Sequence, residues 1–220
     1  MEEKLVCNGE MSFVSPKYVV ACSDEKKTKW GMKQVQRENI QCQTATHLLT
    51  FTVEGYMDIF THPDYRKIIL ESFAFCREHK KLKIHGYVIM SNHIHCIWKA
   101  SNENLSDIVR DFKTFTSKRI TEMILQESDR RKEWLSHMLR FYAKGTNANK
   151  YTKFWQNGNK PLPIYASEEF EHHLLHIHNN PVRAGIVLQA NHYINSSASN
   201  YTQLKSIAEI DIVDSSFFSV

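Results

Sequence analysis

The order of apolar and polar residues predicts a strand followed by a helix in the first half of the chain. Residues 47–53 form a β-rich run, which favours a strand. Thr61–Asp64 offers a helix start, with proline tolerated in the first turn. Apolar side chains then recur at helical spacing, at Tyr65, Ile68, Ile69, Phe73 and Cys76. We expect this helix to lie on a sheet.

Two further β-rich segments, Leu82–Met90 and His93–Lys99, are separated only by Ser91 and Asn92, which predicts a tight hairpin. Side chains alternate across a strand, so the second segment has two different faces. One face is expected to carry Ile94, Cys96 and Trp98, and the other His93, His95 and Ile97. The apolar trio is expected to pack in the core, which leaves both histidines on the opposite side.

The second half of the chain is predicted to be mainly helical. A long amphipathic helix follows a cap at Asn104, and another covers about residues 127–142. A short extended region at 153–165 precedes a last helix, 167–180, which we expect Ser167 to cap and Pro181 to stop. This order predicts an α+β fold, with an antiparallel sheet and helices mainly on one of its faces.

Composition narrows this picture to one soluble globular domain. With 220 residues, 42% of them hydrophobic, the chain has enough apolar material for one core. No apolar run approaches the roughly 20 residues that a membrane span requires, so we expect a cytoplasmic protein without a membrane partner. The five cysteines form no Cys-x-x-Cys pair, which favours reduced thiols. A metal ion would therefore need other ligands.

The net charge of +4 permits a polyanionic partner without proving one. Basic residues are frequent from residue 110 onward and could line a groove for a nucleic-acid strand. The residues selected as candidate DNA contacts are Arg110, Lys113, Lys153, Lys160 and Arg183.

His93 and His95 are the first candidate chemical site. At positions i and i+2 of one strand, their imidazoles lie on the same face and can chelate one divalent cation. The pattern is weak evidence by itself, because a His-x-His occurs by chance in many proteins and this chain has 12 histidines.

Four motifs in order strengthen this interpretation. They are His93-Ile94-His95, Phe154-Trp155-Gln156, residues 177–185 (Ile-His-Asn-Asn-Pro-Val-Arg-Ala-Gly) and Ser196-Ser197-Ala198 with Asn200-Tyr201. Over about residues 47–201 the chain resembles the REP-associated tyrosine transposases, which are HUH single-strand DNA transposases. The resemblance implies a ferredoxin-like sheet that presents two histidines to Mg²⁺ or Mn²⁺. It also implies single-stranded or hairpin DNA as the partner and DNA transposition, by cleavage and rejoining, as the activity.

Position by position, His93 and His95 match the metal ligands of that family, and Asn180 matches the ligand from the late helix. In the family, the tyrosine nucleophile stands four residues before this ligand, but here that position is His176. A second departure is Lys160, where relatives often have histidine before the proline. The nucleophile is therefore missing from its expected place.

Several interpretations of His176 stay open. It could attack phosphate to give a labile phosphoramidate, act as a third imidazole ligand, or be an exposed helix residue. Tyr165 is a substitute nucleophile to be considered. For the whole protein, the alternatives to a DNA-processing enzyme are a catalytically silent DNA-binding regulator and a metal-dependent hydrolase with another substrate.

The expected organisation is a leader of unknown role at residues 1–45, a transposase-like HUH domain at 46–205 and a C-terminal tail at 206–220. The pattern is compatible with a monomer or a homodimer.

Overall fold

The computed structural model describes residues 40–101, 104–126, 130–144 and 152–213. Every described residue belongs to one compact unit, Gln36–Val220. Most of the predicted leader, residues 1–39, and the end of the predicted tail, residues 214–220, lie outside the described residues.

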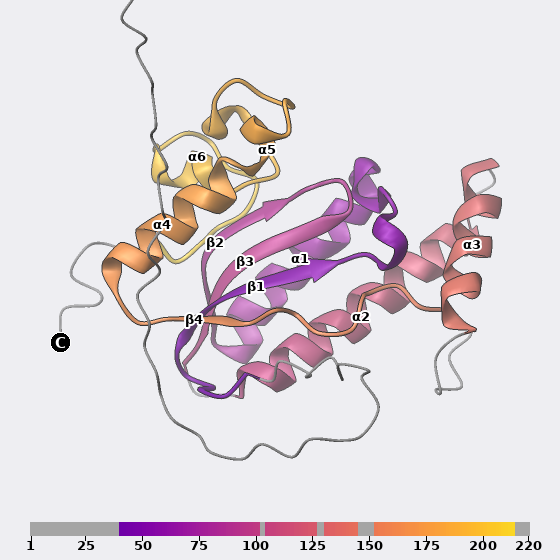
Figure 1. Ribbon diagram of the computed structural model, residues 1–220, viewed down its shortest axis with the longest axis horizontal. Helices are drawn as coiled ribbons and strands as arrows, with labels where there is room; N and C mark the ends of the chain where they lie inside the picture. Colours follow the sequence, from indigo (N-terminus) through magenta and orange to yellow (C-terminus); the bar gives the residue numbers. More distant parts are fainter. Residues whose placement is uncertain (1–39, 102–103, 127–129, 145–151, 214–220) are drawn as a thin grey trace, which may run out of the picture. The chain divides into compact units, whose positions relative to one another are not determined.

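A four-stranded antiparallel sheet forms the centre of the described unit (Figure 1). Its strands are β1 (Thr46–Thr52), β2 (Leu82–Ile89), β3 (His93–Ala100) and β4 (Leu162–Ile164), in the order β2-β3-β1-β4. Helix α1 (Pro63–Lys80) connects β1 to β2, and the elements between β3 and β4 include helices α2 (Leu105–Gln126) and α3 (Arg130–Ala143). This is the ferredoxin-like topology that the sequence predicted.

The predicted hairpin is confirmed, and it places β3 in the middle of the sheet. Strands β2 and β3 pair antiparallel, and the Met90 amide donates to the His93 carbonyl across the turn. On its other side β3 pairs with β1, which sets Thr50 opposite His95 and Thr52 opposite His93. Two short 3₁₀ helices, η1 (Glu54–Tyr56) and η2 (Ile59–Thr61), follow β1. They are tied to the hairpin turn, because the Phe60 amide donates to the Ser91 carbonyl.

The alternating pattern of β3 separates two hydrophobic clusters. Ile94, Cys96 and Trp98 are fully buried in the larger cluster, which includes apolar residues of α1, α2 and α3. Phe112 of α2, for example, has its ring centroid 5.2 Å from that of Trp98. Ile97 belongs to the smaller cluster on the opposite face. The prediction that the apolar trio packs in the core is therefore confirmed.

Helix α4 (Ser167–His178) packs on the histidine face of the sheet, through Phe170 and Ile177 in the smaller cluster. A glycine in β2 permits the close approach. A Cβ atom added at Gly86 would lie 2.7 Å from Leu174 Cδ1 and 3.2 Å from Ile177 Cδ1. The helix is seen beside β2 in Figure 1. Most helical cover is on the other face, as expected, but α4 is the element that reaches the histidines.

The predicted ends of α4 need correction. Ser167 is not its cap: Ala166 holds the capping position without a side-chain hydrogen bond, and Ser167 is already helical. The Glu169 carboxylate accepts a hydrogen bond from the Tyr165 amide instead. The helix ends at His178 rather than Asn180, and a separate short helix α5 (Asn180–Arg183) follows. Pro181 lies in its first turn, where the missing N–H costs no helical hydrogen bond.

The closing stretch of the chain adds to the sheet face that carries α4. It contains the short helices η3 (Ala190–His192) and α6 (Ala198–Tyr201). The Ser197 hydroxyl accepts a hydrogen bond from the Tyr87 amide and lies 2.8 Å from Nε2 of the buried His178. Burial lowers the pKa of His178 to about 4, so this imidazole is neutral at pH 7. The histidine of the predicted late motif therefore joins α4 to the closing stretch.

Parts of the predicted leader and tail that the structure describes pack on the same unit. Ile40 is buried in the larger cluster, and the Gln43 side chain accepts from the Ser106 amide at the start of α2. Asp211 accepts from the Ile84 amide of β2 and forms an ion pair with Arg77. No helix in the described part of the chain is both long and apolar enough to cross a membrane.

Candidate metal and nucleic-acid site

His93 and His95 lie side by side near the start of β3, next to the hairpin turn. Their ring centroids are 4.8 Å apart, and both side chains are partly exposed. Two imidazoles at this separation, held by one central strand, can approach the same ion without rearrangement of the backbone.

Each ring has a polar partner at Nδ1. Asn92 Oδ1 lies 2.7 Å from His93 Nδ1, and Thr50 Oγ1 lies 2.9 Å from His95 Nδ1. When Nδ1 donates to such an oxygen, the lone pair is on Nε2, which is then the nitrogen that can bind a metal ion. The two partners also fix the orientation of the rings.

The local electrostatics keep both imidazoles neutral. Burial lowers the pKa of His95 to about 3, with smaller contributions from His93, His176 and the positive charges of Arg183 and Lys160. Burial also lowers the pKa of His93. Because a metal ligand must be deprotonated, two neutral rings at pH 7 are ready to donate electron pairs.

Helix α4 brings His176 to this pair. The ring centroids of His176 and His95 are 6.3 Å apart, in an edge-to-face arrangement. Arg183 of α5 lies against the same ring: Nη1 is 3.3 Å from His176 Nδ1, Nη2 is 3.3 Å from Nε2, and Nη2 also donates to the His176 carbonyl. Burial, followed by the Arg183 charge, lowers the pKa of His176. A neutral imidazole and a guanidinium thus stand together beside the histidine pair.

Comparison with known proteins decides the family. Residues 43–158 match the sequence model of the family described as "Transposase IS200 like". The match extends over more than half of the chain. This chain belongs to the IS200-like transposase family. A solved structure described as a REP-associated tyrosine transposase bound to a REP hairpin has the same fold, with a TM-score of 0.54 and 19% sequence identity. The alignment covers 83% of this chain and 94% of that chain. No curated protein matches the chain.

The match to the IS200-like transposases includes the histidine pair but ends before α4. His176, Asn180 and Arg183 therefore rest on the structure and on the late sequence motif. Asn180 is partly exposed and begins α5, so it does not share one continuous helix with His176. The helix expected to carry both residues is interrupted at Asn179, which keeps αR backbone angles.

The basic residues predicted to contact DNA fall into two groups. Lys160 and Arg183 are exposed, and their charges act on His95, so they lie at the histidine site. Lys160 also has a left-handed backbone, with φ of 45°.

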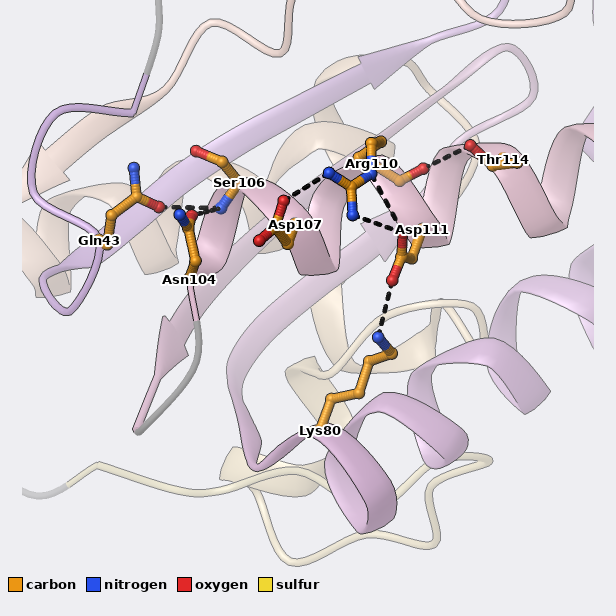
Figure 2. A network of polar contacts seen from close by, with 8 residues as sticks. All are labelled: Gln43, Lys80, Asn104, Ser106, Asp107, Arg110, Asp111 and Thr114. Carbon is orange, nitrogen blue, oxygen red and sulfur yellow. Dashed lines mark hydrogen bonds and ion pairs between the residues drawn. The ribbon is translucent and has the colours of Figure 1, made fainter.

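Arg110, Lys113 and Lys153 form contacts within the fold instead. Arg110 forms ion pairs with Asp107 and Asp111 on the outer side of α2 (Figure 2). Because α2 covers the face that carries Trp98, Arg110 lies across the sheet from the histidines. Lys113 donates to the carbonyls of Gln156 and Gly158 and to Asn159 Oδ1, which ties α2 to the loop before β4.

Lys153 forms an ion pair of 2.7 Å with Glu54, and both side chains are largely buried. The sequence identified these three residues as basic, but it could not identify the partners that hold them.

The donor set fits a divalent cation in part. Two neutral imidazoles supply nitrogen ligands, and the Asn180 amide is an oxygen donor on the adjoining helix. In the residues that the structure describes, no group of three or more histidine, cysteine, aspartate or glutamate side chains is arranged around one ion. His176 therefore does not complete a three-imidazole site, and Arg183 lies against both of its ring nitrogens.

Tyr165 is poorly placed as a substitute nucleophile. It is 66% exposed and precedes the first turn of α4, whereas His176 is in the last turn. At 1.5 Å per helical residue, the part of α4 from Ser167 to His176 alone is about 14 Å long.

Thr50 and Asn92 were missed as part of the site. Asn92 stands next to His93 in the motif, so adjacency was an available signal. Thr50 is 45 positions from its partner His95, and only the register of β1 against β3 brings them together.

A separate cavity of about 430 Å³ lies between α4 and the closing stretch, where it is lined by Leu174, Leu175, His178 and Tyr201, among others. None of His93, His95 and His176 lines it.

Proposed function

We propose that this chain binds single-stranded or hairpin DNA at the histidine face of its sheet, with a divalent cation at His93 and His95. The observation that carries the proposal is the pair of neutral imidazoles whose Nδ1 atoms have polar partners. Membership of a transposase family makes DNA the substrate class to consider first. The similarly folded REP-associated transposase, whose described complex contains a hairpin, supports this choice. The domain responsible would span residues 46–205.

In this proposal Asn180 supplies an oxygen ligand beside the two imidazoles, and Lys160 and Arg183 contact the DNA backbone. Mg²⁺ or Mn²⁺ would polarise the phosphodiester held there. Lys160 and Arg183 attract and orient the phosphates, since cationic side chains dominate backbone contacts. A transposase-type cleavage and rejoining reaction would also require a nucleophile.

His176 favours a second candidate, a catalytically silent DNA-binding regulator derived from a transposase. It occupies the expected position of the tyrosine, and a phosphoramidate formed by imidazole would be too labile to conserve the bond for rejoining. Arg183 also lies 3.3 Å from a ring nitrogen of His176, so this ring already has a polar partner. In both candidates the surface that binds DNA is the same, and they differ in whether a strand is cut.

The test is DNA affinity as a function of salt. We expect hairpin and single-stranded oligonucleotides to bind more tightly than a blunt duplex at matched ionic strength. Replacing Lys160 and Arg183 with glutamine should weaken binding and reduce the salt slope by roughly 0.7 for each phosphate that the variant no longer neutralises. Fluorescence anisotropy from about 50 to 300 mM salt measures both quantities.

Arg110→Gln is the matched control, because it removes a surface arginine across the sheet from the site. It should leave the salt slope unchanged. Equal affinity for the blunt duplex, or an equal effect of Arg110→Gln, would contradict the proposed surface.

A further inference from the structure

Helix α3 presents aromatic and cationic side chains to solvent along one face. We define the outer face of α3 as Trp134, His137, Arg140 and Phe141, together with Lys144 directly after the helix, all of which are exposed. Trp134 and Phe141 are 50% and 56% exposed, although side chains of this size normally bury most of their surface. They are seven positions apart, two helical turns, so both rings point to the same side. The opposite side of α3 packs in the core through Leu135 and Leu139.

The charge around these rings is positive. Residues 131–144 contain Arg131, Lys132, Arg140 and Lys144 against one carboxylate, Glu133. Arg140 and Lys144 are both exposed, and within the described residues no carboxylate forms an ion pair with either of them. Such a face suits an anionic partner that also has flat apolar surfaces. A single nucleic-acid strand combines both, because its bases stack on aromatic rings and its phosphates attract cations.

Helix α3 is held, through residues outside its outer face, by the segment that also supports the hairpin turn. The Tyr142 ring covers Gly55, so closely that an added Cβ would overlap it, and Arg131 donates to the Asp58 carbonyl and to Thr61 Oγ1. The Asn92 side chain in turn donates to the Tyr56 carbonyl.

Residues 54–61 therefore connect α3 to the hairpin turn that precedes His93, the first residue of β3. At the junction Tyr56 is itself 66% exposed. Leu135 and Leu139 place α3 with the larger cluster, on the other side of the sheet from the histidines. A strand held at the histidine pair would therefore reach α3 by passing the hairpin turn and the exposed Tyr56 ring.

We infer that the outer face of α3 is a stacking surface for the single-stranded part of the DNA, with bases on Trp134 and Phe141 and phosphates near Arg140 and Lys144. This inference rests on the proposed function, because it assigns a path to the strand bound at the histidine face. It adds an interaction that reads no sequence, since every base offers a flat ring.

The experiment measures binding of a 20-nucleotide oligo(dT) to the full chain by fluorescence anisotropy. Replacing both Trp134 and Phe141 with alanine should lower the affinity by at least roughly thirty-fold, because two bases would have no ring on which to stack. The salt slope should stay unchanged, since no cation is removed. An unchanged salt slope distinguishes the loss of stacking from the loss of charge, because the variant of Lys160 and Arg183 is expected to reduce the slope. Trp134→Phe should retain most of the affinity, because phenylalanine keeps an aromatic ring. This conservative variant keeps the test informative if the double alanine variant does not fold.

Phe75→Ala is the matched control, because Phe75 is also 50% exposed but lies on α1, where its ring contacts His79. It should bind like the wild type. Wild-type affinity in the double alanine variant would overturn the stacking surface and leave the proposed function standing. A dimer that these substitutions dissociate, seen by light scattering without any decrease in oligo(dT) binding, would also overturn it. A wild-type chain that binds no DNA would refute both proposals.

Discussion

At the scale of single residues, Thr50 is the clearest example of a side chain that acts through another. Its hydroxyl lies 2.9 Å from His95 Nδ1, which orients the ring and leaves Nε2 for a metal ion. Partners of this kind change the affinity of a metal site although they do not touch the metal. Thr50 is thus a positioning residue in the proposed site.

We expect Thr50→Val to weaken Mn²⁺ binding by about 10- to 100-fold, because valine keeps the shape but cannot accept the hydrogen bond. Thr50→Ser should retain most of the affinity. Free Mn²⁺ measured by electron paramagnetic resonance gives the affinity without reference to activity. Unchanged Mn²⁺ binding in the valine variant would show that Thr50 does not orient the ligand.

The residue at position 176 determines whether the site can form a covalent intermediate. Its ring faces His95 across 6.3 Å between centroids, so this position points toward the histidine pair. We expect the wild-type chain to form little or no covalent adduct with DNA, even with Mg²⁺ or Mn²⁺ present. His176→Tyr should restore a metal-dependent adduct that resists denaturation, because a phenol gives a stable phosphotyrosyl bond.

Denaturing gel electrophoresis of a labelled hairpin with each protein measures the adduct. The double variant of His176→Tyr with His95→Ala is the control and should give no adduct. A strong wild-type adduct mapped to Tyr165 or another tyrosine would show that the nucleophile has moved.

At the scale of elements, the contact between α4 and β2 places His176. Gly86 lets Leu174 and Ile177 approach the strand, so the helix lies close enough for its last turn to reach the histidine face. The bulge of β2 between Ile84 and Gly86 lies at the same place. The geometry of the site therefore depends on a packing contact that contains none of its polar residues.

Gly86→Val should lower the free energy of unfolding by about 1–3 kcal/mol, because its side chain would collide with Leu174. Gly86→Ala should cost less. Adding Leu174→Ala to the valine variant should recover part of the stability, since it removes the atom nearest to the new side chain. Urea denaturation of the wild type, the two Gly86 variants, Leu174→Ala and the double variant measures these differences. A double variant that is destabilised by more than the two single variants together would contradict this packing argument.

At the scale of the whole molecule, buried neutral histidines make stability depend on pH. Burial lowers the pKa of His178 to about 4 and also lowers the pKa of His85, whereas an imidazole in the unfolded chain titrates near 6.5. Between these values the unfolded chain takes up protons that the folded chain does not. The stabilising difference is complete above about pH 6.5 and is lost as the pH falls toward the folded pKa.

We therefore expect the free energy of unfolding to decrease from pH 6.5 to pH 5, by up to about 1.4 kcal/mol per pH unit for each such histidine. Urea denaturation at fixed ionic strength measures the slope. His178→Gln should flatten it, whatever its effect on stability at pH 7. The exposed substitution His79→Gln should leave the slope as it is, and a flat wild-type profile over this interval would rule out the linkage.

The sequence by itself determined the features that depend on local periodicity and motif order. The hairpin, the two faces of β3 and the stripe of α1 follow from alternation and helical spacing, and all three are confirmed. The transposase family was predicted from the resemblance that the ordered motifs carry, and the family match over residues 43–158 confirms it.

Tertiary structure alone decided which distant residues meet. Thr50 reaches His95 through strand register, and Arg183 reaches His176 across the junction between α4 and α5. It also separated the basic residues: Lys160 and Arg183 lie at the site, while Arg110, Lys113 and Lys153 are held by partners elsewhere. A charge is visible in the sequence, but its partner is set by packing between segments far apart along the chain, which no local pattern encodes.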